Sequence, residues 1–353
     1  MKASQRKHDN AFDLLRLVLA LLVVYTHAHL LGAFGEEPLS KFVRSQTSAG
    51  TLAVLGFFGL SGFLVTQSFE VQGDGLLFAR ARLLRILPGL YLALVLTAFV
   101  FAPCISHFGS AAGGWNATEA TGYIVRNALV VVREWNIGRT LAGLPYEGSL
   151  NGALWSLFPE CICYGVVLLL GLLGSIPLRR VNVLMLLVVV YVFHVILVVS
   201  PGSSSRVPTV LSLTGWAPDI AAFLTGSAVY LYRQEVAPGG NQAWLWLLVS
   251  AGLLKFGGWV LLAPLVLPLA LIHGAHLFRV RLPFDLSYGI YVLHFPVLQL
   301  LSAIGLHHQG FVRYFGAGVF ITILFAAVSW FLVERPSLAF KRTKVSETPA
   351  RIG

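Results

Sequence analysis

The sequence predicts an all-α polytopic membrane protein with about ten transmembrane helices, and two features of its composition carry this prediction. Hydrophobic residues make up 57% of the 353 residues and charged residues only 11%, an apolar excess that a soluble domain does not need. The net charge of +10 lies in short basic clusters between apolar runs, as in cytoplasmic loops of membrane proteins. We therefore expect the lipid bilayer, and no nucleic acid, as a partner. The sequence leaves the oligomeric state open.

Ten apolar runs are long enough to form membrane-spanning helices. They cover residues 12–32, 50–69, 86–104, 152–174, 181–200, 213–232, 243–256, 259–278, 285–305 and 313–333. We expect the seventh and eighth runs to form a tight hairpin that turns at Gly257 and Gly258.

The distribution of basic residues predicts the orientation of these spans. Placing the N-terminus in the cytoplasm puts fifteen of them on the inner side: Lys2, Arg6, Lys7, Arg80, Arg82, Arg85, Arg179, Arg180, Arg233, Arg279, Arg281, Lys341, Arg342, Lys344 and Arg351. Eight then lie on the outer side: Lys41, Arg44, Arg126, Arg133, Arg139, Arg206, Lys255 and Arg313. Because Lys and Arg concentrate in cytoplasmic loops, we predict that both termini are cytoplasmic.

We expect one transmembrane domain over residues 1–340, followed by a cytoplasmic tail at 341–353. The long connection at 105–150 lies on the outer side in this topology, and its length is typical of a lid or a binding element. A short amphipathic segment is expected within it, at 123–132. The cysteines Cys104, Cys161 and Cys163 have neither metal nor disulfide spacing, so we expect them to pack between helices and expect no metal.

The first span carries two polar side chains, Arg16 and His27, in an otherwise apolar run. Eleven residues advance a helix by about 1100°, almost three turns, so both side chains lie on one face, about 16 Å apart along the axis. Titratable groups inside a membrane are costly and mark functional sites. The structural alternative is that Arg16 snorkels to the inner interface while His27 caps the outer one.

Three arginines, Arg80, Arg82 and Arg85, precede Pro88 at the start of the third span. Arg82 and Arg85 are three residues apart and therefore share a helix face, at the membrane level of Arg16. The positive-inside rule alone explains such a cluster. Guanidinium groups also match phosphate geometry, so a site for a nucleotide diphosphate is the second interpretation.

The fourth span contains Glu160, about three turns into the membrane from its outer end, where a carboxyl must be paired, neutral or functional. Ser156, Glu160 and Tyr164 follow at intervals of four and are expected to form one polar stripe. Pro159 cannot donate to the carbonyl of Trp155, which leaves that carbonyl for another partner. A structural pair with an arginine is the alternative role of Glu160.

The second span contains Gly56, Gly59 and Gly62, which recur every three residues and predict close packing against another helix. Ser61 faces a different direction and is a candidate to line a cavity.

The ninth span contains Tyr288, Tyr291 and His294 at intervals of three, and Pro296 leaves the carbonyl of Val292 without its helical donor. A histidine packed in the core and held by tyrosine is the structural alternative to a site here.

The helix rise allows a comparison of depth. At about 1.5 Å per residue, His27 and Glu160 stand at similar heights above the cytoplasmic ends of their helices. His27 and Glu160 would then meet as an acid–base pair in the outer half of the membrane. One polar path would join this pair to an anion site formed by the arginines at the inner face.

Five segments, in order, resemble the acyltransferase family 3 integral membrane enzymes, which include bacterial O-acetylases of O-antigen and exopolysaccharide. They are Arg16 to His27, Gly56 to Leu64, Arg82 to Pro88, Asn151 to Tyr164 and Ser287 to Pro296, and the closing Glu334-Arg335-Pro336 is also typical. Ala153 departs from a more common serine or threonine, and Phe158-Pro159 from Pro-Val. The resemblance implies transfer of an acyl group, usually acetyl, from cytoplasmic acyl-CoA to a carbohydrate or glycoconjugate hydroxyl, in the inner membrane of a bacterium.

The polar residues fit roles in such a reaction. Arg16, Arg82 and Arg85 are expected to hold the phosphates of acetyl-CoA or another acyl-CoA. His27 is expected to take the proton of the acceptor hydroxyl, and Glu160 to fix its tautomer and stabilise the imidazolium. Direct transfer and a covalent acyl intermediate on His27 or Ser61 both stay open. The candidates for substrate binding are Ser61, Trp155, Ser156, Tyr164, Tyr288, Tyr291 and His294.

A proton-coupled transporter is the alternative from another functional class. His27, Glu160 and His294 in mid-membrane would serve a proton relay equally well. Such a transporter predicts inverted-repeat symmetry, which we do not find in the sequence.

Overall fold

The computed structural model describes residues 11–109, 114–174, 176–200, 213–236, 240–278, 280 and 282–340, and these residues form helices and loops without a strand. The predicted tail at 341–353 lies outside them. The chain divides into two compact units. The first unit is Met1–Leu30, Phe34–Val71 and Pro159–Ser287, and the second unit is Leu31–Ala33, Gln72–Phe158 and Tyr288–Gly353.

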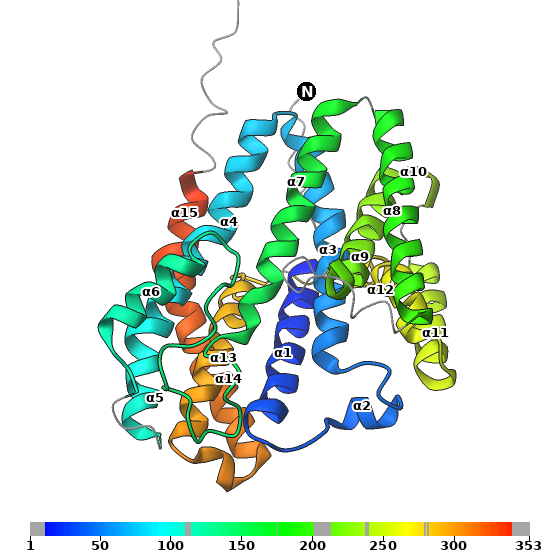
Figure 1. The fold of residues 1–353 in the computed structure, drawn as a ribbon. Coiled ribbons are helices and arrows are strands. Elements are labelled where there is room, and N and C mark those ends of the chain that lie inside the picture. Colours follow the sequence, from blue (N-terminus) through cyan, green and yellow to red (C-terminus); the bar gives the residue numbers. More distant parts are fainter. Residues whose placement is uncertain are drawn as a thin grey trace, which may run out of the picture. The chain divides into compact units, whose positions relative to one another are not determined.

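The first unit is built from α-helices (Figure 1). They are α1 (Phe12–Leu31), α2 (Pro38–Phe42), α3 (Ala49–Gln72), most of α7 (Leu157–Leu173), α8 (Ile176–Val199), α9 (Leu213–Leu231), α10 (Arg233–Val236), α11 (Gly240–Phe256) and α12 (Trp259–Ala275). Gly257 and Gly258 between α11 and α12 have φ angles of +109° and +91°, which glycine adopts without steric cost. The predicted hairpin at these two glycines is therefore confirmed.

The second unit contains α-helices interrupted by short 3₁₀ and π segments. They are α4 (Gly75–Leu96), η1 (Thr97–Phe101), α5 (Ala102–Phe108), α6 (Ala117–Asn127), η2 (Gly152–Ser156), α13 (Ser287–Ala303), η5 (Leu306–Gln309), α14 (Phe311–Ser329), η6 (Trp330–Glu334) and α15 (Arg335–Ala339). The third predicted span begins too late at residue 86, because Asp74 caps a longer helix by accepting hydrogen bonds from the backbone N–H groups of Leu76 and Leu77. Arg82 and Arg85 therefore lie inside α4.

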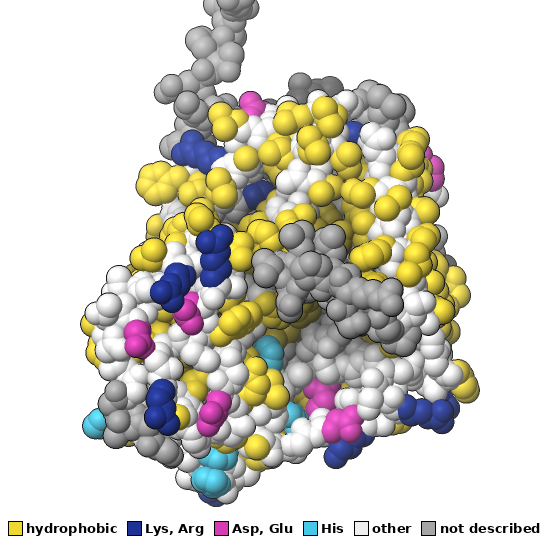
Figure 2. Space-filling model, in the orientation of Figure 1, with side chains coloured by type: hydrophobic (Ala, Val, Ile, Leu, Met, Phe, Trp, Pro, Cys, Tyr) yellow, Lys and Arg dark blue, Asp and Glu magenta, His cyan; other side chains and the backbone are white. Residues whose placement is uncertain are grey.

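Within the described residues, six helices are long and apolar enough to cross a membrane: Phe12–Leu31, Ala49–Gln72, Gly75–Phe108, Gly152–Leu173, Arg179–Val199 and Phe311–Ala339. Each of the ten predicted runs coincides with a helix, the other four being α9, α11, α12 and α13. Figure 2 shows apolar side chains over much of the visible surface, with few charges between them. A multi-pass α-helical membrane protein is thus supported, whereas the number of ten spans and the orientation stay predictions.

The long loop differs in detail from the prediction, because asparagines bound its helix. Asn116 caps α6 by accepting a hydrogen bond from the N–H of Glu119, at 2.8 Å. Asn127 ends the helix, since its side chain bonds the backbone of Arg133 and Glu134 instead. The amphipathic helix therefore covers Ala117–Asn127, six residues earlier than the predicted 123–132.

Glycine permits a close crossing of α3 and α9 in the first unit. A Cβ atom added to Gly62 would lie 1.9 Å from the carbonyl oxygen of Phe223, and one added to Gly226 would lie 2.0 Å from that of Gly59. The Ser227 hydroxyl donates to the Gly62 carbonyl across the same crossing, at 3.2 Å. The predicted packing role of the glycine face is confirmed, because backbone meets backbone here.

This crossing yields a stability prediction. Replacing Gly62 by alanine should destabilise the protein by about 1–3 kcal/mol, because a rigid carbonyl occupies the position of the new methyl group. Gly165 on α7 is the matched control, since its added Cβ would meet nothing within 4 Å. Gly165→Ala should leave stability unchanged or raise it by up to about 1 kcal/mol through helix propensity. Thermal unfolding in detergent measures both, and equal melting temperatures would refute the tight crossing.

Candidate active site

A buried carboxylate joins α1 to α3 next to His27. Glu37, only 4% exposed, accepts hydrogen bonds from the Thr26 hydroxyl and from the backbone N–H of Ala49 at the start of α3. The Thr26 oxygen also accepts from the N–H of Gly50, at 2.7 Å. A carboxylate is favourable at a helix N-terminus, where the backbone N–H groups have no helical acceptor. We call these four residues the Glu37 junction, and it holds in place the residue that precedes His27.

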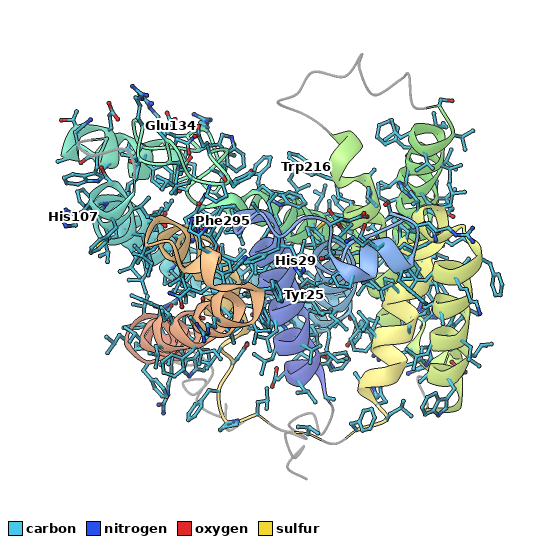
Figure 3. All side chains as sticks on the ribbon, turned by 90° about the horizontal axis from the view of Figure 1, so that it is seen from below. Tyr25, His29, His107, Glu134, Trp216 and Phe295 are labelled. Atoms are coloured by element: carbon cyan, nitrogen blue, oxygen red, sulfur yellow. The ribbon has the colours of Figure 1, made fainter. Side chains whose placement is uncertain are left out.

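His27 itself is half-buried on α1. A second imidazole, His29, follows two residues later and is buried. Its Nδ1 atom lies 3.1 Å from the Tyr25 carbonyl oxygen, and its ring packs edge-on against the Tyr25 ring (Figure 3). We did not predict this residue as part of the site, and its contacts are those of a packing side chain.

Arg16 forms an ion pair that sequence reasoning missed. Its Nη1 atom lies 3.1 Å from a carboxylate oxygen of Asp285, and both side chains are largely buried. The other oxygen of Asp285 accepts from the Ser287 hydroxyl at 2.6 Å. The signal was present in the sequence, because Asp285 starts the ninth run at the predicted membrane level of Arg16. The pair reduces the cost of a guanidinium in this position and orients it.

Glu160 receives hydrogen bonds from two of the predicted site residues. The Tyr164 hydroxyl, one turn along α7, donates to its carboxylate at 2.5 Å, and the Ser61 hydroxyl of α3 donates at 3.5 Å. These partners satisfy one carboxylate oxygen in surroundings that are mostly apolar. The structure thus brings together Ser61, Glu160 and Tyr164, and the pairing of Glu160 with His27 stays a prediction.

The predicted stripe of three polar residues needs a correction. Ser156 is the last residue of the 3₁₀ helix η2, and α7 begins only at Leu157, so regular i, i+4 spacing does not extend back to Ser156. Its hydroxyl instead lies 2.6 Å from the Tyr291 hydroxyl of α13 in the second unit. Trp155 is half-buried in the same 3₁₀ helix.

The arginines of α4 pack against aromatic rings. The guanidinium carbon of Arg85 lies 5.8 Å from the ring centre of Tyr288, and that of Arg82 lies 5.8 Å from that of Phe78. The Tyr288 hydroxyl donates to the carbonyl of Ile86 at 2.7 Å, and its ring fills the space left by Gly89. Tyr288 therefore packs α13 against the turn of α4 that carries Arg85. This structural role is separate from the substrate binding predicted for it.

His294 is completely buried on α13 and its Nδ1 atom lies 3.1 Å from the carbonyl oxygen of Ile290. Two residues before His294, the carbonyl of Val292 accepts a hydrogen bond from the Asn151 amide, at 2.9 Å. This is the carbonyl that Pro296 was predicted to leave without a helical donor. The contacts of His294 agree with the structural alternative for this residue.

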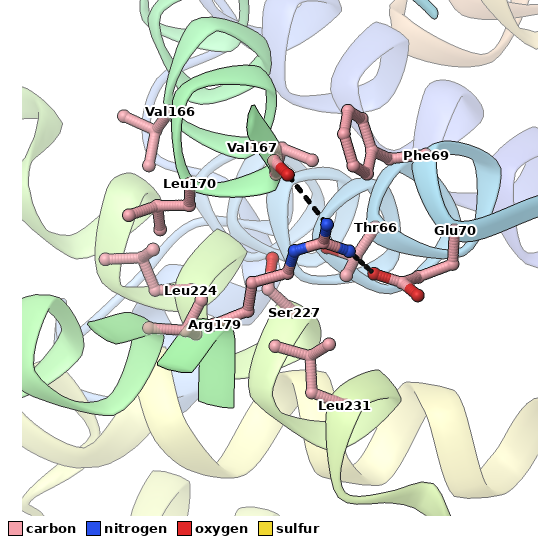
Figure 4. Close-up of a pocket in the computed structure, with 12 residues that line it drawn as sticks. Thr66, Phe69, Glu70, Val166, Val167, Leu170, Arg179, Leu224, Ser227 and Leu231 are labelled. Atoms are coloured by element: carbon pink, nitrogen blue, oxygen red, sulfur yellow. Dashed lines mark hydrogen bonds and ion pairs between the residues drawn. The ribbon is translucent and has the colours of Figure 1, made fainter. Parts of the chain in front are cut away.

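A cleft in the first unit is lined in part by a half-buried arginine, Arg179 (Figure 4). Arg179 donates to Glu70 at 2.5 Å and to the carbonyl oxygens of Gly171 and Gly174 at 2.7 Å each. Its guanidinium also covers the ring of Phe69. Because its donors bond groups of the protein, this arginine ties α3, α7 and α8 together rather than offering an anion site.

One further carboxyl was missed. Asp219 on α9 is 6% exposed and directly follows Pro218, inside the sixth predicted span. The reasoning that selected Glu160, a carboxyl within an apolar run, applies equally to Asp219.

Comparisons with known proteins agree with the resemblance. A family model described as an acyltransferase domain matches residues 9–333. The chain is similar to an O-acetyl transferase from Shigella phage Sf6, with 26% identity over 352 residues that cover 96% of this chain and 98% of the relative. It is also similar to Nodulation protein 10 from Rhizobium leguminosarum bv. viciae, with 27% identity over 372 aligned residues that cover 96% of each. No solved structure matches the chain.

The Glu37 junction yields a prediction. Glu37→Ala should lower the free energy of unfolding by about 1–3 kcal/mol, because it leaves the buried Thr26 hydroxyl and Ala49 N–H without their acceptor. Glu36→Ala is the matched control, since Glu36 bonds only the exposed Ser40 and Ser45 side chains. Thermal unfolding in detergent should show the larger loss for Glu37→Ala. A loss no greater than that of Glu36→Ala would mean that the junction does not hold α1 to α3.

Proposed function

The chain belongs to the acyltransferase domain family, and we propose that it is a membrane O-acyltransferase that moves an acyl group from cytoplasmic acyl-CoA to a hydroxyl of a carbohydrate or glycoconjugate. The observation that carries the proposal from family to mechanism is the Glu160 carboxylate, which Ser61 and Tyr164 hold inside an apolar helix. Acetyl is the proposed acyl group, because the relative from phage Sf6 is named an O-acetyl transferase.

For the donor, we propose that Arg16, Arg82 and Arg85 bind the phosphates of CoA. The rings of Phe78 and Tyr288, whose centres lie 5.8 Å from the guanidinium carbons of Arg82 and Arg85, support this role, because an aromatic contact stabilises a cation without neutralising its charge. Asp285 orients Arg16 in the same way through its carboxylate. Bidentate arginine–phosphate contacts would then contribute to the affinity for CoA and fix the position of its phosphates.

For the chemistry, we propose His27 as the general base. Its imidazole takes the proton of the acceptor hydroxyl as that oxygen attacks the thioester carbonyl, and the imidazolium returns the proton to the departing CoA thiolate. Glu160 stabilises the imidazolium and fixes its tautomer. A covalent route through Ser61 is the variant of this mechanism that the hydrogen bond between Ser61 and Glu160 favours.

For the topology, we propose ten spans with both termini in the cytoplasm, in the inner membrane of a bacterium. The asymmetry of the basic residues supports this orientation, and the coincidence of the helices with the ten runs supports the number of spans. Residues 105–150 would then face the outside of the cell.

The donor site yields a prediction. Arg82→Ala and Arg85→Ala should each weaken acyl-CoA binding by about 1.5–3 kcal/mol, the contribution of a charge-assisted hydrogen bond. Arg80→Ala is the control on the same helix, because Arg80 is exposed and bonds the Phe340 carbonyl. Kd values from acyl-CoA titration of the purified protein measure the effect. Equal Kd values for all three variants and the wild type would remove these arginines from the donor site.

The chemistry yields a second prediction. His27→Ala should lower turnover by about 10²–10⁴-fold, the usual effect of losing acid–base catalysis. Donor binding should survive, because Arg16 lies about 16 Å from His27 along α1. Glu160→Gln should also lower turnover, and the double variant should be far less than multiplicatively worse if the two residues act together. Transfer of labelled acetyl, with acyl-CoA binding as the folding control, measures all three. Wild-type turnover in His27→Ala would end this mechanism.

A further inference from the structure

The second unit contains a cavity of about 460 Å³ that the reaction described above does not use. Its walls are the end of α5 at Phe108, the loop segment Gly143–Pro145, the end of α13 at Ala303, and His307 and His308 between α13 and α14. All of these segments lie on the outer side in the proposed topology. The volume is within the range of small-molecule sites.

Buried amides hold the loop wall of this cavity in place. The Gln299 side chain, completely buried on α13, donates to the carbonyls of Tyr146 and Ser149, at 3.1 and 2.8 Å. The Glu147 carboxylate accepts from the N–H of Gly143 at 2.7 Å, and Gly143 has a φ angle of +80° that suits glycine. The cavity is therefore formed by the folded chain and does not need a ligand to shape it.

The chemistry of the lining indicates an uncharged, hydroxyl-rich ligand. Among the described residues that line the cavity, none is Lys, Arg, Asp or Glu. The polar side chains include His307 and His308, whose rings lie 3.9 Å apart between centroids. Burial, and then the neighbouring His308, lowers the pKa of His307. A neutral imidazole both donates and accepts a hydrogen bond, as a sugar hydroxyl does.

The same lining argues against the donor as occupant. The CoA phosphates need cationic groups, and the described part of the lining contains no Lys or Arg. Phe108, 57% exposed at the rim, offers an apolar surface for the C–H face of a sugar ring.

We propose that this cavity binds a neutral sugar residue of the acceptor glycan, with His307 and His308 as hydrogen-bonding groups and Phe108 as an apolar wall. The proposal rests on the proposed function, because it names the site at which that reaction holds its acceptor. It also gives the outer loop at 105–150 a specific role, which is to form part of the wall of the acceptor site.

Filling the cavity tests the proposal. Ala303→Trp places a bulky ring in the cavity, and Ile304→Trp is the matched control, since Ile304 is exposed and does not line it. The acceptor is cell-envelope polysaccharide of the source cells, freed of O-acetyl groups by alkali, and the donor is labelled acetyl-CoA. Ala303→Trp should raise the half-saturating polysaccharide concentration at least about tenfold and leave the Kd for acetyl-CoA unchanged. Ile304→Trp should resemble the wild type in both.

A second variant covers the case in which Ala303→Trp fails to fold, seen as lost acetyl-CoA binding. His308→Ala changes an exposed side chain and should raise the half-saturating polysaccharide concentration about three- to tenfold. Wild-type saturation in His308→Ala, or in a folded Ala303→Trp, would overturn the cavity proposal while leaving the proposed function intact. A wild-type protein that binds acetyl-CoA but acetylates no polysaccharide would instead overturn the proposed function, and this proposal with it.

Discussion

The structure depends on one constraint: a polar group surrounded by apolar helices must find its partner within the protein. Water is absent from the hydrocarbon core of a bilayer, so an unpaired charge there costs several kcal/mol or more. The described residues meet this constraint with local, specific contacts. Glu160 accepts from Tyr164 and Ser61, and Arg179 donates to Glu70 and to two carbonyls. The contacts of Glu160 with Ser61 and of Arg179 with Glu70 also join helices, so the same hydrogen bonds that partner these charged groups fix the packing.

The same constraint makes it difficult to separate structural from catalytic residues. Tyr288 and His294 were candidates for substrate binding, yet both have contacts that packing alone explains. Glu160 differs, because within the part of the chain that the structure describes its hydrogen-bond donors are the hydroxyl groups of Ser61 and Tyr164 and not cations. A carboxylate held in this way remains able to stabilise a cation that forms during a reaction. The Glu37 junction does not include His27, but it fixes the α1 backbone at Thr26, the residue before His27.

Much of the fold was predictable because helix formation in a membrane follows from local composition. Runs of apolar residues specify helices, and paired glycines specified the turn between α11 and α12. The site was less predictable. Glu160 with Tyr164 followed from one-turn spacing, but the stripe failed at Ser156, where a 3₁₀ turn replaces the α-helix. The pairing of Arg16 with Asp285 was missed, since it joins residues 269 positions apart.

The membrane class, the positions of the helices, the glycine face of α3 and the family all follow from the amino-acid sequence alone. These features depend on periodicity, composition and motif order, all of which are local along the chain. Which polar groups meet depends instead on helix packing, as with Ser156 and Tyr291 at 135 positions apart, or Glu37 at the start of α3. The reason is physical: many polar groups of the chain are chemically able to pair, and helix packing selects among them by bringing particular ones within hydrogen-bonding distance.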